Sequence, residues 1–113
     1  MKDFALIFRL SNIADFRPSP GQLQERMKWL ADLAAQDKLV DKGNTLLPGQ
    51  GSAKNIRPDS SVKDGPYTEI KEFITGYMVV KTGTIEEAVA IAKANPIFKI
   101  GGSVEVREVL KRD

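Results

Sequence analysis

The chain has 113 residues, 42% of them hydrophobic, a size and composition that suit one domain with a core of its own. Its 17 basic and 15 acidic residues are interleaved and leave a formal net charge of +2, so we expect no nucleic-acid binding, which needs a clustered basic surface. Cysteine and histidine are both absent, which removes disulfides and the usual protein ligands of zinc, copper and haem, and we predict neither a metal nor a cofactor.

The first predicted element is a strand at the N-terminus. The apolar residues Phe4, Leu6 and Phe8 alternate along it with a second set that ends in Arg9, so one face is wholly apolar and the other carries a charge. The run is too short for a signal peptide, and no segment approaches the ~20 apolar residues of a membrane span. We therefore expect a cytoplasmic protein without membrane attachment.

A helix is predicted from Pro20 to about Gln36. Ser19 is placed to cap it, and Gln22 stands where the capping-box partner belongs. Apolar residues spaced four, three and four apart predict the stripe of this helix that packs on the core. They are Leu23, Met27, Leu30 and Ala34, with Leu33 beside them. The lone Trp29 lies off the centre of this stripe, where a core-edge or dimer-contact position is favoured over a ligand platform.

The middle of the chain is predicted to be loop-rich. Residues 37–43 lead out of the helix, and a short strand is expected at residues 44–47. Residues 48–61 are rich in Gly, Pro, Ser and Asn, which is typical of a loop. Within it, residues 54–56 and 61–63 are predicted to pair as a small hairpin across the turn at 57–60.

The second half contains a strand, a helix and a last strand. The strand is predicted at residues 73–81, with Ile74, Met78 and Val80 on one face and Phe73 on the other. Thr84 caps a short helix, which the Asn-Pro pair at 95–96 ends. A Gly-Gly turn at 101–102 leads into the final strand, whose alternate residues are apolar and charged.

The predicted order, strand, helix, strand, strand, helix, strand, is that of an α+β ferredoxin-like βαββαβ fold with an antiparallel sheet. Two helices suffice for one face of a four-stranded sheet, so the other face is left open. Its apolar residues are mixed with charged ones, which favours a face-to-face homodimer that encloses a partly polar cavity. In this strand order Arg9, Glu105 and Arg107 converge on the open face, either to bind an anionic ligand or as a salt-bridge network across the dimer.

The residues 64–73 read D-G-P-Y-T-E-I-K-E-F, and Gly76-Tyr77 follows closely. This stretch resembles the signature of the DGPF-type proteins in the YCII-related family, with Tyr67 in place of the usual Phe. The segments W-L-A-D-L-A at 29–34 and G-G-S-V-E-V-R at 101–107 are also similar to that family. The resemblance covers most of the chain as a single domain, 1–113, and implies a dimeric α/β barrel.

The resemblance also bears on the site. Some members of the broader YCII group place a His and an Asp near a pocket, but this chain has no histidine. Arg26 is the residue that best matches the position of that His, so the His-Asp pair does not carry over. Asp64 and Glu105 remain as candidate catalytic bases, and Tyr67 and Tyr77 as candidate hydrogen-bond donors.

We therefore predict a homodimer that binds a small anionic organic ligand in its cavity. The ligand-binding candidates are Arg9, Arg26, Tyr67, Tyr77 and Arg107. The alternative is a non-catalytic dimeric regulatory or interaction module, because proteins resembling DGPF domains are associated with sigma-factor-type regulators. An enzyme and a binding protein both fit the pattern of residues.

Overall fold

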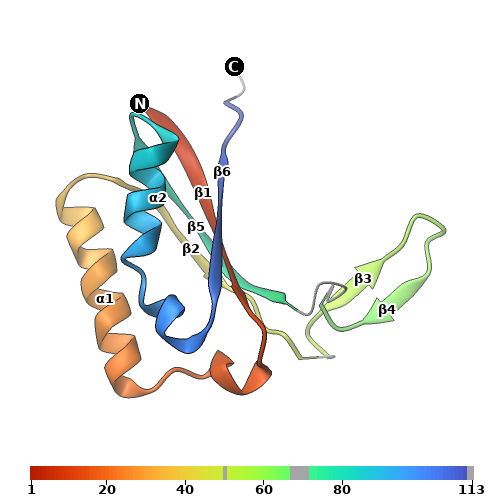
Figure 1. Ribbon diagram of the computed structural model, residues 1–113. Helices are drawn as coiled ribbons and strands as arrows, with labels where there is room; N and C mark the ends of the chain where they lie inside the picture. Colours follow the sequence, from red (N-terminus) through yellow and green to blue (C-terminus); the bar gives the residue numbers. More distant parts are fainter. Residues whose placement is uncertain (50, 67–71, 112–113) are drawn as a thin grey trace.

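A computed structural model of the chain describes residues 1–49, 51–66 and 72–111. The strands form a four-stranded antiparallel sheet in the order β2-β5-β1-β6 and a separate pair β3-β4 (Figure 1). The elements are β1 (Lys2–Leu10), η1 (Ile13–Phe16), α1 (Pro20–Ala35), β2 (Leu39–Thr45), β3 (Lys54–Ile56), β4 (Val62–Asp64), β5 (Phe73–Thr82), α2 (Ile85–Lys93), η2 (Pro96–Ile100) and β6 (Ser103–Glu108).

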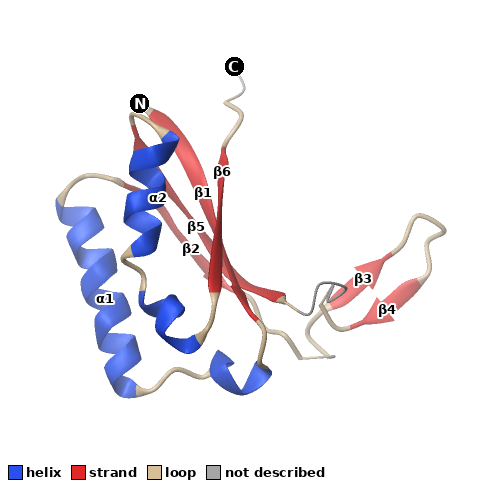
Figure 2. Cartoon of the chain, viewed as in Figure 1, coloured by secondary structure: helices blue, strands red, loops and turns tan. Residues whose placement is uncertain are grey.

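Both α-helices lie on the same side of the four-stranded sheet, and its other side carries no helix (Figure 2). β1 lies between β5 and β6, which is the place of the first strand in a ferredoxin-like sheet. The fold is the predicted α+β, ferredoxin-like plan, with a small hairpin inserted between β2 and β5. Within the part of the chain that is described, no helix is long and apolar enough to cross a bilayer.

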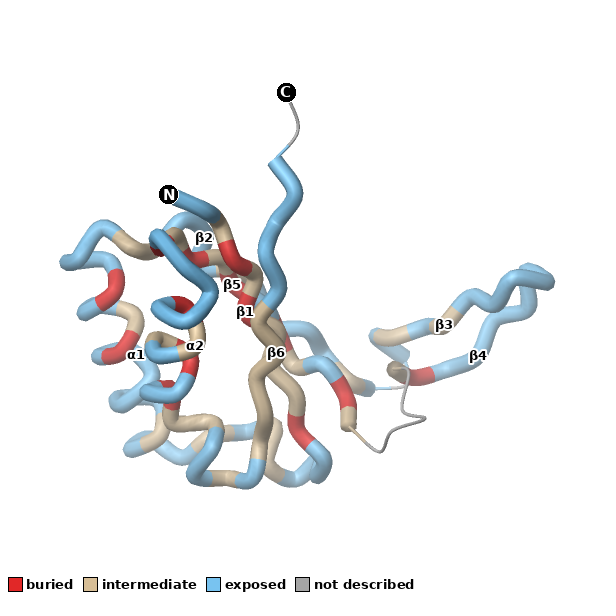
Figure 3. The backbone as a smooth tube through the Cα atoms, turned by 45° about the horizontal axis from the view of Figure 1, so that its top comes forward, coloured by how far each residue is buried: buried red, intermediate tan, exposed pale blue. Residues whose placement is uncertain are grey.

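The hydrophobic core fills the layer between the helices and the sheet, where the buried positions of Figure 3 gather. Phe4 and Leu6 of β1 and Val80 of β5 are 0% exposed. The core residues alternate along each strand, because successive side chains of a strand point to opposite faces. The whole cluster consists of Phe4, Leu6, Trp29, Leu33, Met78, Val80, Ala88 and Ala92.

The caps of α1 are those the sequence predicts, but its core-facing stripe is only partly confirmed: Leu33 is buried and Leu30 packs against the core, whereas Leu23 and Met27 are exposed. The Ser19 side chain accepts from the backbone of Gln22, whose side chain accepts in return from the backbone of Ser19. Trp29 is only 8% exposed, whereas Met27 is 67% exposed and points away from the core. Two stripes fit the helical period, and the one that buries the largest side chain, Trp29 with Leu33, faces the sheet.

Strand β2 is longer than predicted and begins earlier, at Leu39 instead of Asn44. Its pairing with β5 is irregular, with register shifts on both sides of Asp41. Gly43 has a φ of +68°, and a Cβ there would lie 1.6 Å from the carbonyl oxygen of Tyr77. The residues of β2 therefore do not alternate regularly between apolar and polar. This is why the sequence pattern does not predict residues 37–43 as part of a strand.

Strand β5 contains a register shift that reverses the predicted faces at its start. Phe8 pairs with Gly76 and Arg9 pairs with Ile74, which leaves Thr75 without a partner in β1. Strict alternation from the buried Met78 would place Ile74 on the core face and Phe73 on the open face. Because of the register shift, Phe73 is buried instead and Ile74 is 40% exposed. The predicted strand is confirmed, and the predicted faces are wrong at these two positions.

The hairpin β3-β4 projects from the body of the molecule as an arm (Figure 1). β3 has the predicted bounds, and β4 begins one residue later than predicted. Lys54 pairs with Asp64 and Ile56 with Val62 across the arm. The predicted hairpin is therefore confirmed.

Candidate functional site

A cavity of about 120 Å³, partly open to solvent, lies between the N-terminal half of α1 and the sheet. Segments far apart in the sequence build it, namely the ends of β1 and β2, the first half of β5, and both short helices η1 and η2. Its lining residues are Phe8, Leu10, Asp15, Phe16, Pro18, Gln22, Arg26, Trp29, Leu30, Lys42, Asn44, Thr45, Thr75, Gly76, Tyr77, Met78, Asn95, Pro96, Ile97 and Ile100.

The inner wall of this pocket is apolar and fixed in place. The rings of Phe8 and Trp29 meet edge to face, with centroids 6.5 Å apart and planes at 82°. The indole N–H of Trp29 donates to the backbone carbonyl of Ile91 at 3.1 Å, which anchors the ring to α2. A wall held in this way suits the apolar body of a small ligand.

Two cationic side chains line the same pocket. Arg26 lies one turn before Trp29 on α1, on the helix side that faces the sheet, and its Nη2 is 3.5 Å from the Oγ1 of Thr45 on β2. Lys42 comes from β2. Among the described residues neither cation forms an ion pair with a carboxylate. Both charges are therefore available to an anion in the pocket.

Asn95 contributes a buried amide to the pocket. It is 8% exposed, and its side-chain oxygen accepts from the backbone N–H of Ile97 at 2.8 Å, which caps η2. This bond fixes the orientation of the side-chain amide. Within the described ranges its NH₂ group has no protein acceptor, so it can donate to a ligand in the pocket.

The carboxylate in the lining belongs to Asp15, a half-buried residue of η1. The side chain of Asn12 caps this short helix by accepting from the backbone N–H of Ala14 at 3.0 Å. Asp15 has no cationic partner in the portion of the chain that the structure describes. The described residues also contain no group of three or more acidic side chains that could hold a metal ion.

The register shift in β5 helps to shape the pocket. Thr75, which has no register partner in β1, lines the pocket, and next to it Gly76 brings the strand close to β2. A Cβ at Gly76 would lie 2.8 Å from the carbonyl oxygen of Asn44, so no larger residue fits without a shift of backbone. Local irregularities of this kind often re-aim side chains beside binding sites.

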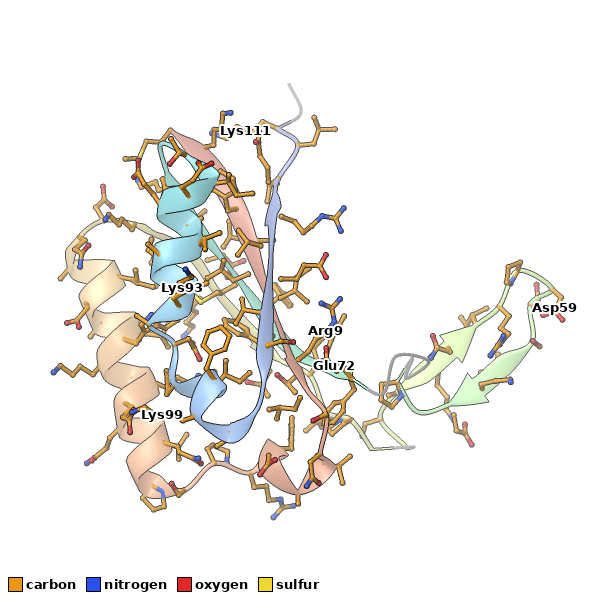
Figure 4. The ribbon with its side chains drawn as sticks, viewed as in Figure 1. Arg9, Asp59, Glu72, Lys93, Lys99 and Lys111 are labelled. Carbon is orange, nitrogen blue, oxygen red and sulfur yellow. The ribbon has the colours of Figure 1, made fainter. Side chains whose placement is uncertain are left out.

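The charges expected on the open face are found there. Arg9 Nη1 donates to Glu105 Oε1 at 2.5 Å, and Arg107 Nη1 donates to Glu105 Oε2 at 3.0 Å. The hydrogen bond from Arg9, followed by that from Arg107, lowers the pKa of Glu105 below its usual 4.5. Arg9 lies on the side of the sheet away from both helices (Figure 4). This trio is therefore separate from the pocket.

The other predicted site residues are divided between different places. Arg26 and Tyr77 both line the pocket. Tyr77 pairs with Ile7 in the sheet, and its hydroxyl accepts a hydrogen bond from Asn44 Nδ2 at 2.9 Å. Asp64 pairs with Lys54 on the projecting arm. Tyr67 lies outside the described residues.

Sequence reasoning missed Asp15, Lys42 and Asn95. The residues around Asp15 show no helix or strand periodicity, and Lys42 lies in a segment without strand alternation. Asn95 was interpreted only as a helix stop before Pro96, although an Asn before Pro is also the usual signal for the cap of a following short helix. None of the three lies close to another in the sequence, and the fold alone brings them to one pocket.

Comparison with known proteins identifies relatives at the level of family and fold. The model of the YCII-related domain matches residues 14–112. No curated protein matches the chain. A similar solved structure is 5-chloro-2-hydroxyhydroquinone dehydrochlorinase (TftG) from Burkholderia phenoliruptrix AC1100, in complex with 2,5-dihydroxybenzoquinone. The TM-score is 0.56 at 17% identity, over 97% of this chain and 95% of that one.

Proposed function

Because this chain belongs to the YCII-related family, we propose that it binds a small organic anion with an apolar body, in the pocket between α1 and the sheet. One observation carries the proposal. Two cations, Arg26 and Lys42, line a largely apolar pocket, and no described carboxylate forms an ion pair with either of them.

The chemistry of the lining supports this choice of ligand. Arg26 can bind a carboxylate through two parallel N–H donors, and Lys42 adds a point charge. Phe8 and Trp29 offer aromatic surface to a ring or short chain. The NH₂ group of Asn95 supplies a neutral donor for a further oxygen. The similar solved structure is a complex with a dihydroxybenzoquinone, a compact ring that bears oxygens, which supports a ligand of this size.

We propose that the protein is a homodimer that pairs through the open face of the sheet. Ile7, Ile74 and Tyr77 leave apolar surface on this face, and Ile74 and Tyr77 are 40% and 37% exposed. Exposed apolar surface on a sheet is characteristic of an interface. The earlier expectation of a cavity enclosed by two copies, with Arg9 and Arg107 in its wall, stays a prediction.

A second candidate function is a dimeric interaction module without a ligand at the open face. The observation that favours it is the pairing of Glu105 with both Arg9 and Arg107, since charges that bond to one another need no anion. Replacing both arginines by methionine tests whether the open face binds a ligand in addition to pairing two copies, because Arg9 and Arg107 are outside the pocket lining. If the dimer tightens and no ligand response is lost, the charges serve neither binding nor catalysis.

The pocket proposal is tested with phenylpyruvate, which combines a carboxylate, a ketone and a ring. Isothermal titration should show binding to the wild type and a weakening of about tenfold to a hundredfold in Arg26→Met and Lys42→Met, the loss expected for a charged hydrogen bond. Arg57→Met is the matched control, because Arg57 is exposed on the arm and also carries one charge. Equal affinity in all four proteins, or none in the wild type, would overturn the proposal.

A further inference from the structure

The candidate bases suggested by the sequence, Asp64 and Glu105, have different surroundings from Asp15, which lines the pocket. Asp64 lies on the arm and pairs with Lys54. Glu105 bonds to Arg9 and Arg107, which hold it in the ionised form. Both are already engaged with cations, and neither lines the pocket. A carboxylate that donates its electron pair to two guanidinium groups is a poor proton acceptor.

Asp15 differs from the other two on both counts. It lines the pocket, and within the described ranges it has no cationic partner. It belongs to η1, while the cations Arg26 and Lys42 come from α1 and β2. The carboxylate and the two cations thus reach the pocket from different elements, and a ligand held by the cations presents its remaining atoms to the rest of the lining.

We infer that Asp15 is the proton acceptor of this pocket and that its substrate class is small, enolisable 2-oxo acids. The inference rests on the proposed function, because Arg26 and Lys42 must first hold the carboxylate of the substrate. The ketone oxygen then has a donor in the NH₂ group of Asn95, and the apolar wall receives the side chain of the acid.

The proposed step is balanced without any further reagent. Asp15 takes a proton from the carbon next to the ketone, and the electron pair of the broken C–H bond forms a carbon–carbon double bond. The ketone oxygen takes up the negative charge as an enolate, to which Asn95 donates a hydrogen bond. Return of a proton from Asp15 to carbon restores the keto acid, and protonation on oxygen gives the enol.

The charges of the pocket suit this sequence of events. Two cations and one carboxylate leave an excess of one positive charge, which the carboxylate of the substrate neutralises. The same cations then stabilise the additional negative charge of the enolate, which exists only after the proton has moved. Among the described residues of the lining, Asp15 is the one that can accept this proton as a carboxylate.

Proton exchange into phenylpyruvate in D₂O tests the inference directly. Loss of the methylene signal in ¹H NMR is followed with wild type, Asp15→Asn, Asp15→Ser and Asp32→Asn, and the spontaneous rate is subtracted. Asp32 is an exposed carboxylate of α1 outside the pocket lining, so its variant should match the wild type. Both Asp15 variants should lose at least about a hundredfold of the protein-catalysed rate, the usual contribution of a general base.

Titration of phenylpyruvate into the same variants separates the two proposals. Both Asp15 variants should bind it at least as tightly as the wild type, because they lack a negative charge near an anion, and this binding also verifies their fold. Exchange at the wild-type rate in these variants overturns the role of Asp15. Binding without accelerated exchange in the wild type overturns the catalytic inference alone. Absence of binding to the wild type overturns the proposed function and the inference together.

Discussion

The guanidinium of Arg9 and the carboxylate of Glu105 meet at 2.5 Å between β1 and β6, on the sheet face that carries no helix. Arg107 bonds to the other oxygen of the same carboxylate. Two arginines that the sequence suggested as ligand contacts thus bond to a glutamate that it suggested as a catalytic base. The cations of the pocket, Arg26 and Lys42, lie elsewhere and form no ion pair among the residues that the structure describes.

The Arg9–Glu105 pair predicts a specific dependence of stability on pH. The pKa of Glu105 is lowered in the folded state, chiefly by the hydrogen bond from Arg9, so its contribution is present above the usual pKa of 4.5 and is lost as the pH falls through the lower folded value. Glu105→Gln should therefore unfold at a lower temperature than the wild type near pH 7. The difference should shrink below about pH 4.5.

Thermal unfolding followed by circular dichroism from pH 7 to pH 2 checks this expectation. Asp32→Asn serves as the control, because Asp32 is exposed on α1 and forms no ion pair among the described residues. A difference between Glu105→Gln and wild type that stays constant over the whole range would contradict the assigned linkage.

The orientation of α1 predicts unequal costs for two truncations on the same helix. Leu33→Ala removes a side chain that is 5% exposed in the core and should lower the free energy of unfolding by about 2–5 kcal/mol. Met27→Ala removes a side chain that is 67% exposed and should change it by less than about 0.5 kcal/mol. Urea denaturation measures both, and comparable losses would mean that Met27 also faces the core, which would contradict the described orientation of α1.

The close approach of β2 to β5 predicts that Gly43 is irreplaceable. A Cβ there would lie 1.6 Å from the carbonyl oxygen of Tyr77, and the φ of +68° is unfavourable for other residues. Gly43→Ala should cost about 3 kcal/mol or more of unfolding free energy. Gly49→Ala is the control, since a Cβ at Gly49 meets nothing within 4 Å. Equal denaturation midpoints for the two variants would contradict the described β2–β5 pairing.

The proposed homodimer predicts that a charge on the open face prevents association. Ile74→Glu places a carboxylate on exposed apolar surface, so it should weaken the dimer at least about tenfold while the monomer stays folded. Met27→Glu, on the exposed side of α1, should leave the dimer intact if the sheet face is the interface. Sedimentation equilibrium distinguishes the two outcomes, and dissociation by Met27→Glu alone would place the interface on the helices.

Much of the fold could be predicted from local signals. Ser19, Pro20 and Gln22 form a capping box that begins α1 where the sequence indicates, and the alternation in β1 identifies its core face. The errors occur where long-range pairing overrides a local pattern. Phe73 is buried only because Thr75 drops out of register with β1, and no periodicity within β5 reveals that.

The site was less predictable for the same physical reason. The sequence pointed to Arg26 through a family resemblance, and Arg26 does line the pocket. Asp15, Lys42 and Asn95 lie in a loop, an irregular strand and a helix terminus, and each has an ordinary structural interpretation in isolation. Only the packing of η1, β2 and η2 around α1 makes them neighbours of one cavity.

A titration of ¹⁵N-labelled protein with phenylpyruvate, followed by amide chemical shifts, shows directly whether an organic anion binds in the pocket. If it binds there, the largest changes should cluster at pocket amides such as Thr45, Gly76 and Ile97, and Arg26→Met should suppress them. Changes centred on Arg9 and Glu105, and unaffected by Arg26→Met, would contradict binding in the pocket and place the ligand on the open face of the sheet.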